Sequence, residues 1–140
     1  MVTTFVVYGE PVGKARPRMT RTGHVYTPSK TRLYEEHIRD AWRAKNVPTL
    51  PTGQPVRVSI DAFFSVPKSV SKKRRATMEN APYLHKPDID NVVKSVLDGL
   101  NGLAFDDDAR ICVLRTTKQY TLGEPRVEVA IEWEDADGTP

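Results

Sequence analysis

The sequence contains a single cysteine, Cys112, and no long hydrophobic run. One cysteine excludes an internal disulfide and any metal site built from several cysteines, and it is typical of the reducing cytoplasm. No apolar stretch approaches the roughly 18 residues that a membrane-spanning helix needs. Residues 1–5 (MVTTF) lack the basic start and the apolar stretch of a secretory signal. We therefore expect a cytoplasmic protein with no membrane partner.

The remaining composition is that of an ordinary globular domain. The chain has 140 residues, of which 39% are hydrophobic and 28% are charged. This length is typical of one domain and is sufficient for a hydrophobic core without disulfides. No internal repeat or low-complexity block interrupts it. The sequence therefore predicts a single domain over residues 1–140.

Positive charge is concentrated in two segments, although the net charge is only +3. Residues 10–30 carry five basic side chains against one acid, and residues 65–86 carry six against one. Two basic segments on a small domain are typical of a polyphosphate partner such as a nucleic acid. The alternative is two solvated loops that bind nothing, and charge alone does not exclude it.

Hydrophobic spacing and the positions of Pro and Gly predict six main elements. These are strands at residues 3–8, 56–64, 111–120 and 127–133, and helices from residue 28 or 29 to before residue 48 and over residues 89–100. We also expect a flexible basic loop at about 10–29 with a hairpin at Thr22-Gly23, a short helix at 71–78 and a frayed acidic tail at about 135–140. The order β-α-β-α-β-β predicts an α+β fold, a mixed β-sheet with two main helices packed on one face.

The helix over residues 89–100 carries the most regular pattern in the chain. Apolar residues at positions 89, 92, 93, 96, 97 and 100 form one stripe, and Gly102 ends it. On the opposite face Asp90, Lys94 and Asp98 recur every four residues. Asp88 lies at or just before the first turn.

Acidic residues on both sides of this helix indicate a metal site. Asp88 and Asp90 stand two residues apart at the helix start, and residues 106–108 (DDD) lead into the next strand. If that strand packs beside the helix, we expect the acidic loop to lie near Asp88 and Asp90. Carboxylates held close together repel unless a cation lies among them, and an all-oxygen ligand set suits Mg²⁺ or Mn²⁺. Such an ion activates water for attack on a phosphodiester, and Lys94 would stabilise the developing charge.

Each of these features also has a purely structural explanation. Acids in a first helical turn are favoured by the helix dipole and by capping. Asp90, Lys94 and Asp98 also fit a surface ion-pair ladder worth about 0.3 kcal/mol per pair. Residues 106–108 fit a solvated turn. A calcium loop beginning at Asp106 does not fit, because its sixth position is Ile111 rather than Gly.

Residues 86–94 (KPDIDNVVK), 97–102 (LDGLNG) and 107–111 (DDARI) together resemble the RusA family of Holliday junction resolvases. The opening, residues 9–18 (GEPVGKARPR) with residues 25–28 (VYTP), is similar to phage- or prophage-type members. The resemblance extends from about residue 5 to 133. The motif at residues 86–94 together with the later acidic motif at 107–111 is specific for the family, whereas either motif alone would be weak evidence for it.

The resemblance implies an endodeoxyribonuclease that depends on Mg²⁺, with Mn²⁺ as the alternative ion. Asp88, Asp90 and Asp108 would hold the metal and, with Lys94, form the catalytic set. The acidic run has three members, so Asp107 stays a candidate, although the Ala-Arg-Ile that follows favours Asp108. Members act as homodimers that make paired symmetric nicks in a four-way DNA junction during recombination and repair.

With that substrate, the basic segments gain a role in gripping DNA phosphates. The candidate nucleic-acid-binding residues are Lys14, Arg16, Arg18, Arg21, Lys72, Lys73, Arg74, Arg75 and Lys86. Two other functions stay open: a non-catalytic module that binds branched or single-stranded DNA, and a metal-dependent nuclease for another branched nucleic acid.

The remaining notable side chains have structural interpretations. His37 lies on the apolar stripe of the first helix and is expected in the core or at its boundary. Cys112 is expected to be a small buried hydrophobe within a strand. Trp42 and Trp133 fall on the apolar faces of their elements and are expected in the core. His85, which precedes the acidic motif, is not expected to be a ligand.

Overall fold

The computed structural model of the chain describes residues 1–134, so the acidic tail expected at 135–140 lies outside the described residues. The elements are β1 (Val2–Tyr8), β2 (Arg18–Met19), β3 (Val25–Tyr26), α1 (Ser29–Arg43), β4 (Val56–Ser65), α2 (Lys72–Arg75), α3 (Ile89–Leu100), the 3₁₀ turn η1 (Asp108–Arg110), β5 (Ile111–Thr121) and β6 (Arg126–Trp133). The predicted order of main elements is confirmed. None of the described helices is long and apolar enough to cross a bilayer.

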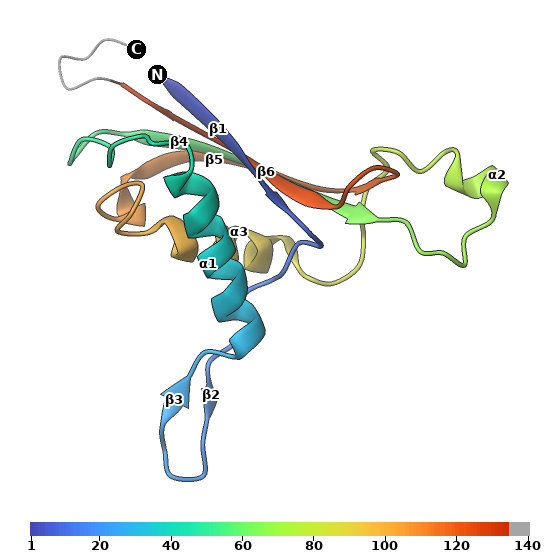
Figure 1. The fold of residues 1–140 in the computed structure, drawn as a ribbon, viewed down its shortest axis with the longest axis horizontal. Coiled ribbons are helices and arrows are strands. Elements are labelled where there is room, and N and C mark those ends of the chain that lie inside the picture. The colour runs from blue at the N-terminus through green and yellow to red at the C-terminus, as the bar shows by residue number, and fades with distance from the viewer. Residues whose placement is uncertain (135–140) are drawn as a thin grey trace.

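The main sheet is mixed, as the sequence predicts. Its strand order is β1-β6-β4-β5, in which β4 and β5 are parallel and the other neighbours antiparallel. Figure 1 shows α1 and α3 together on one face of this sheet, which confirms the α+β fold. The strands β4 and β6 alternate buried and partly exposed residues, because only one face of each is covered by the helices.

The core lies between the sheet and the two helices. Buried side chains on α1, α3 and the strands form one cluster, which includes Ile38, Trp42, Val96, Ile60 and Ile131. The two helices approach closely at Gly99, where an added Cβ would lie 3.0 Å from Ile38 Cγ2. Trp42 and Trp133 are both buried, as expected.

Two expectations about burial are wrong. His37 is exposed, because the buried stripe of α1 runs through Tyr34, Ile38 and Trp42 and position 37 faces away from it. Cys112 is also exposed, because β5 is an edge strand and the start of this strand is poorly covered.

Two segments project from the body in different directions (Figure 1). The first is the expected hairpin, formed by β2 and β3 with Gly23 at a positive φ of 90° in the turn. The second, residues 66–82, carries α2, which is shorter than the helix expected at 71–78. A small separate cluster of Val66, Met78 and Tyr120 ties the base of this second projection to β5.

Candidate active site

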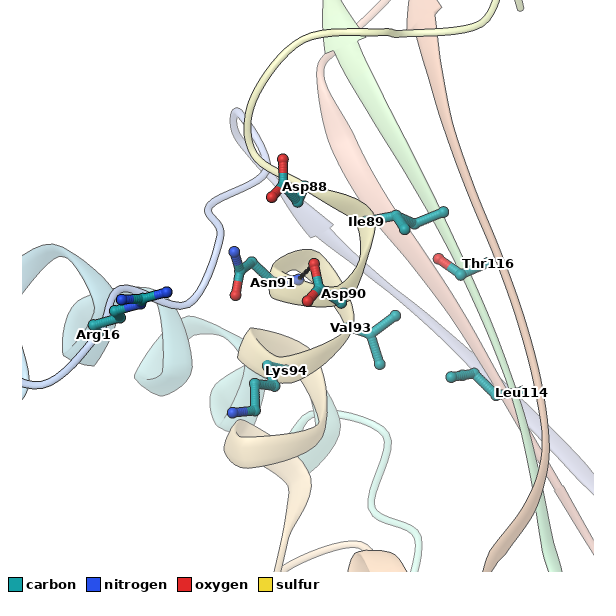
Figure 2. A pocket seen from close by; sticks show the side chains of 9 residues that line it. All are labelled: Arg16, Asp88, Ile89, Asp90, Asn91, Val93, Lys94, Leu114 and Thr116. Atoms are coloured by element: carbon teal, nitrogen blue, oxygen red, sulfur yellow. Dashed lines mark hydrogen bonds between the residues drawn. The ribbon is translucent and has the colours of Figure 1, made fainter.

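Two aspartates at the start of α3 face the same pocket. Asp88 is the N-cap residue, yet its side chain makes no capping hydrogen bond. The carboxylate of Asp90, two residues later, accepts a hydrogen bond from the Asn91 amide at 3.0 Å. Both carboxylates line a pocket with Arg16, Asn91 and Lys94, as Figure 2 shows. The helix start therefore presents two carboxylates to one pocket.

A lysine next to the pocket pairs with the first aspartate. Lys86 Nζ lies 2.7 Å from Asp88 Oδ1, and both side chains are largely exposed. The hydrogen bond from Lys86, with the positive charges of Lys86 and Lys118, lowers the pKa of Asp88 below its ordinary value. These contacts therefore favour the charged form of the Asp88 carboxyl.

Two cations border the same pocket. Lys94 lies one turn beyond Asp90 on α3, and Arg16 comes from the loop between β1 and β2 (Figure 2). Both are exposed, and within residues 1–134 neither makes an ion pair. The other side of the pocket faces β5, where Ile89 points toward Thr116 and Val93 points toward Leu114. The pocket therefore combines two carboxylates with two available cations.

The loop that carries Arg16 is docked on α3. An added Cβ on Gly13 would lie 2.5 Å from Pro87 Cβ, so only glycine permits this approach. The Lys14 amide donates to the Asn91 carbonyl at 2.8 Å. Its ammonium lies 2.6 Å from Glu35 and 3.1 Å from Asp98. Lys14 thus joins the loop to both helices.

Lys14 is mostly buried, which shapes its electrostatics. Burial alone would lower the pKa of Lys14, but the hydrogen bonds and charges of Glu35 and Asp98 outweigh it and raise the pKa above its ordinary value. The sequence places Lys14 in a DNA-binding loop. In the structure this side chain is committed to two carboxylates, and Arg16 is the member of the loop that lines the pocket.

The third expected metal ligand lies at the opposite end of α3. The Asp108 amide donates to Asn101 Oδ1 at 2.9 Å, and Asn101 is the C-cap of the helix. Between Asp90 and Asn101 a helix advances about 16 Å at roughly 1.5 Å per residue. The expectation that the acidic loop lies beside Asp88 and Asp90 is therefore wrong within one chain. Because residues 101–110 join the end of α3 to the start of β5, they must lie at that end.

Negative charge accumulates around this loop. A hydrogen bond shared with Asp107, then partial burial and the charges of Asp107 and Asp98, raise the pKa of Asp108. The Ala109 amide and the hydrogen bond from Asp108 lower the pKa of Asp107. Of these two neighbouring carboxyls, Asp108 is therefore the one that is protonated first as the pH falls.

The donor set at the start of α3 fits a hard divalent cation. Mg²⁺ is commonly bound by one or two carboxylates, with water and substrate phosphate completing its shell. Asp88 and Asp90 supply two such carboxylates in one solvent-accessible pocket. In the described part of the chain, no three His, Cys, Asp or Glu side chains are grouped closely enough to hold a metal ion. One chain thus brings two carboxylates to this pocket.

The other basic candidates lie on the two projections. Arg18 and Arg21 are exposed on the hairpin, and Lys72, Lys73 and Arg74 are exposed on α2. Arg75 differs, because its guanidinium donates to the Pro67 carbonyl at 2.7 Å and helps to fold the projection.

Sequence patterns missed a second lysine beside the pocket, Lys118 of β5. Its ammonium donates to the carbonyl oxygens of His85 and Pro87, both at 2.7 Å. It also lies 5.3 Å from the ring centre of Tyr83. No local pattern distinguishes this lysine from other strand lysines, because its partners lie about thirty residues away in the chain.

Comparison with known proteins agrees with these motifs. The sequence model of a family described as endodeoxyribonuclease RusA matches residues 8–132. An uncharacterized protein of Bacillus subtilis (strain 168), YqaN, is 39% identical over 134 residues, covering 91% of this chain and 93% of that protein. A DNA endonuclease family is consistent with a pocket that combines carboxylates and cations. The chain belongs to the RusA family of endodeoxyribonucleases.

Proposed function

We propose that the protein is a Mg²⁺-dependent endonuclease that resolves four-way DNA junctions by paired symmetric nicks. The observation that carries this proposal is the convergence of Asp88 and Asp90 on one pocket with Lys94 and Arg16. Nucleases of the RusA family generally depend on a divalent metal ion, and the family acts on branched DNA. Mn²⁺, which has similar ligand preferences, would be an alternative to Mg²⁺.

Each residue of the pocket has a distinct role in this proposal. When bound, the metal ion supplies a water activated for attack on a phosphodiester. Asp88 and Asp90 would hold the ion, which at Asp88 would take the place of the Lys86 contact. Lys94 and Arg16 bind non-bridging oxygens of the scissile phosphate and stabilise the charge that develops on them. Lys86, once released, is free to bind a neighbouring phosphate.

The proposed homodimer explains how a third carboxylate reaches the metal. Within one chain Asp108 lies at the far end of α3 from Asp90. A two-fold arrangement can bring opposite ends of two α3 helices together, so that Asp108 of the partner subunit completes each site. Ile89 and Leu114 are exposed where they line the pocket, and a second copy would cover them.

The two projections would grip the arms of the junction. Exposed positive charge is carried on α2 by Lys72, Lys73 and Arg74 and on the hairpin by Arg18 and Arg21, and these two segments project in different directions (Figure 1). Phosphate contacts of this kind position DNA without reading its sequence. We place the activity in recombination and repair of DNA in the bacterial cytoplasm, and the opening motif supports a phage or prophage origin.

The deciding experiment uses a labelled immobile four-way junction, incubated with Mg²⁺ or with EDTA. Linear duplex of the same sequence and the Asp90→Asn variant serve as controls. We expect paired nicks on the junction that need both Mg²⁺ and Asp90. The Asp90→Asn variant should bind the junction as the wild type does, because it removes a ligand charge and leaves the basic projections intact.

Other outcomes would overturn parts of the proposal. Tight, salt-sensitive junction binding with no nick in any sequence context would favour a non-catalytic DNA-binding module. Cleavage of flaps or RNA–DNA hybrids in preference to junctions would retain the chemistry and change the substrate. Wild-type rates in Asp90→Asn would show that the metal-ligand assignment is wrong.

A further inference from the structure

Residues 80–87 lead into α3, and the first of them, residues 80–83, bond to the end of β5 around an isolated bridge between Pro82 and Gln119. The amide of Tyr120 donates to the Ala81 carbonyl at 2.8 Å, and the amide of Tyr83 donates to the Lys118 carbonyl at 3.1 Å. The ring of Tyr83 stacks on Phe64 with a centroid distance of 3.8 Å. This segment is therefore attached to the sheet up to Tyr83, and its last residues depend on other contacts.

Three successive carbonyl groups before Asp88 are each held by a side chain. Lys118 Nζ donates to the carbonyl oxygens of His85 and Pro87 at 2.7 Å each. Tyr83 Oη donates to the intervening carbonyl of Lys86 at 3.1 Å. The ammonium of Lys118 also lies over the Tyr83 ring, so the two side chains form one unit. This unit fixes the backbone immediately before Asp88.

The same unit explains why Asp88 is available to a ligand. An aspartate at the N-cap usually accepts a hydrogen bond from the first turn of its helix and so fixes the helix start. The Asp88 side chain makes no such bond. The start of α3 is instead fixed from behind, through backbone carbonyls. We propose that Lys118 is a positioning residue of the metal site, which holds the backbone so that the Asp88 carboxylate faces the pocket.

This inference rests on the proposed function. Lys118 can affect metal binding by its charge or by positioning Asp88, and these two roles predict opposite changes in metal affinity when Lys118 is replaced. If Lys118 acted only as a nearby positive charge, its removal would strengthen the binding of a cation at Asp88. If it positions Asp88, its removal would weaken that binding, as loss of an outer-shell partner commonly does by about tenfold or more. The sign of the change in metal affinity therefore separates the two roles.

The experiment measures Mn²⁺ binding to the DNA-free protein by electron paramagnetic resonance, for wild type, Lys118→Met and Lys45→Met. Lys45 is an exposed lysine just after α1, which makes it a matched control for loss of charge. We expect Lys118→Met to weaken Mn²⁺ binding by about tenfold and Lys45→Met to leave it unchanged. Junction binding in EDTA should stay within about twofold of wild type, because phosphate contacts are made elsewhere.

A milder variant covers the case in which Lys118→Met does not fold. Tyr83→Phe keeps the stacked ring and removes only the hydrogen bond to Lys86, so we expect Mn²⁺ binding about threefold weaker. Unchanged or tighter Mn²⁺ binding in folded Lys118→Met, or unchanged binding in Tyr83→Phe where only that variant folds, would overturn the inference. A wild-type protein that neither binds Mn²⁺ nor cleaves DNA would instead overturn the proposed function itself.

Discussion

Lys86 and Asp88 form an ion pair of 2.7 Å at the mouth of the pocket. The pair is exposed, with 82% of the Lys86 side chain accessible to solvent, so it contributes little to stability. Its consequence is local. The ammonium contacts an oxygen of Asp88 that a metal ion would need, and its hydrogen bond lowers the pKa of that carboxyl.

Replacing Lys86 should therefore tighten metal binding. In Lys86→Met the metal no longer has to displace an ammonium from Asp88. From the strength of exposed ion pairs, we expect the affinity for the metal to rise about two- to fivefold. The gain should shrink as the pH falls, because Asp88 without Lys86 has a higher pKa and protonates earlier. Titration of the DNA-free protein with Mg²⁺ measures this, with Lys45→Met as the control. Weaker Mg²⁺ binding in Lys86→Met would contradict it.

A site shared between two copies predicts complementation between inactive variants. Asp90→Asn and Asp108→Asn should each be inactive alone. In a mixed dimer, one site receives intact Asp88 and Asp90 from one copy and intact Asp108 from the other. After subunit exchange, random pairing should restore about one quarter of the nicking sites. A mixture as inactive as its components would show that the carboxylates act within one chain, or that Asp108 is not a ligand.

Gly13 should not tolerate a side chain. An added Cβ would lie 2.5 Å from the ring carbon of Pro87, and a proline ring cannot turn away. We expect Gly13→Ala to lower the free energy of unfolding by about 1–3 kcal/mol through backbone shifts. Urea denaturation measures this. Gly123→Ala is the matched control, because its Cβ would meet only Thr121 Oγ1 at 3.5 Å. Equal stability of both variants would contradict the close packing.

The ion pairs of Lys14 should contribute measurably to stability. Lys14→Met leaves Glu35, which is only 12% exposed, without a counter-charge. We expect the free energy of unfolding to fall by about 2 kcal/mol, a value between those typical of surface and of buried ion pairs. Because folding raises the pKa of Lys14 above 10.5, the contribution is complete below that pH and is lost as the pH rises through the folded value. The difference in the free energy of unfolding between Lys14→Met and wild type should therefore become smaller above pH 10.5.

Urea denaturation at neutral and at alkaline pH measures both parts of this prediction. Junction binding in EDTA by Lys14→Met should match that of wild type, provided that the variant is folded. A difference in stability that grows at alkaline pH would contradict the assignment.

The exposed cations of α2 should determine the salt dependence of DNA binding. Replacing Lys72, Lys73 and Arg74 by Gln should reduce the slope of log affinity against log salt by about 0.9 for each DNA phosphate that is no longer neutralised. Arg75 is kept, because it holds the Pro67 carbonyl. The control replaces three cations on or just after α1, namely Arg32, Arg43 and Lys45. Equal slopes in both triple variants would show that α2 does not bind phosphate.

Sequence periodicity predicted the main elements well, because each buries one regular face. The helix at residues 89–100 and the strands β4 and β6 follow this rule closely. Periodicity does not predict where a strand lies in the sheet. Cys112 stands in a strand pattern, but β5 proved to be an edge strand, so its exposure depended on which strands pair. Pairing over long distances leaves little trace in local spacing.

The candidate site was predictable where its residues are neighbours in the chain. Asp88, Asp90 and Lys94 lie on adjacent turns, and the structure brings them to one pocket. The distance to Asp108 and the hydrogen bonds of Lys118 depend on how the chain returns from α3 to β5, which local spacing does not encode. The role of Lys14 was also not predictable from sequence. A lysine in a basic loop looks the same whether it binds DNA or, as here, pairs with carboxylates of its own chain.

The parallel pairing of β4 with β5 has an evolutionary consequence. One crossover, residues 66–110, contains the α2 projection, both pocket aspartates and the acidic loop. Met78 and Tyr83 contact β5 and anchor the chain there, between the α2 projection and the part of the crossover that carries the aspartates. Insertions and deletions between residues 67 and 77 can therefore lengthen or shorten the reach of the protein without displacing its carboxylates. Descendants could acquire differently shaped targets by changing one loop while inheriting the same chemistry.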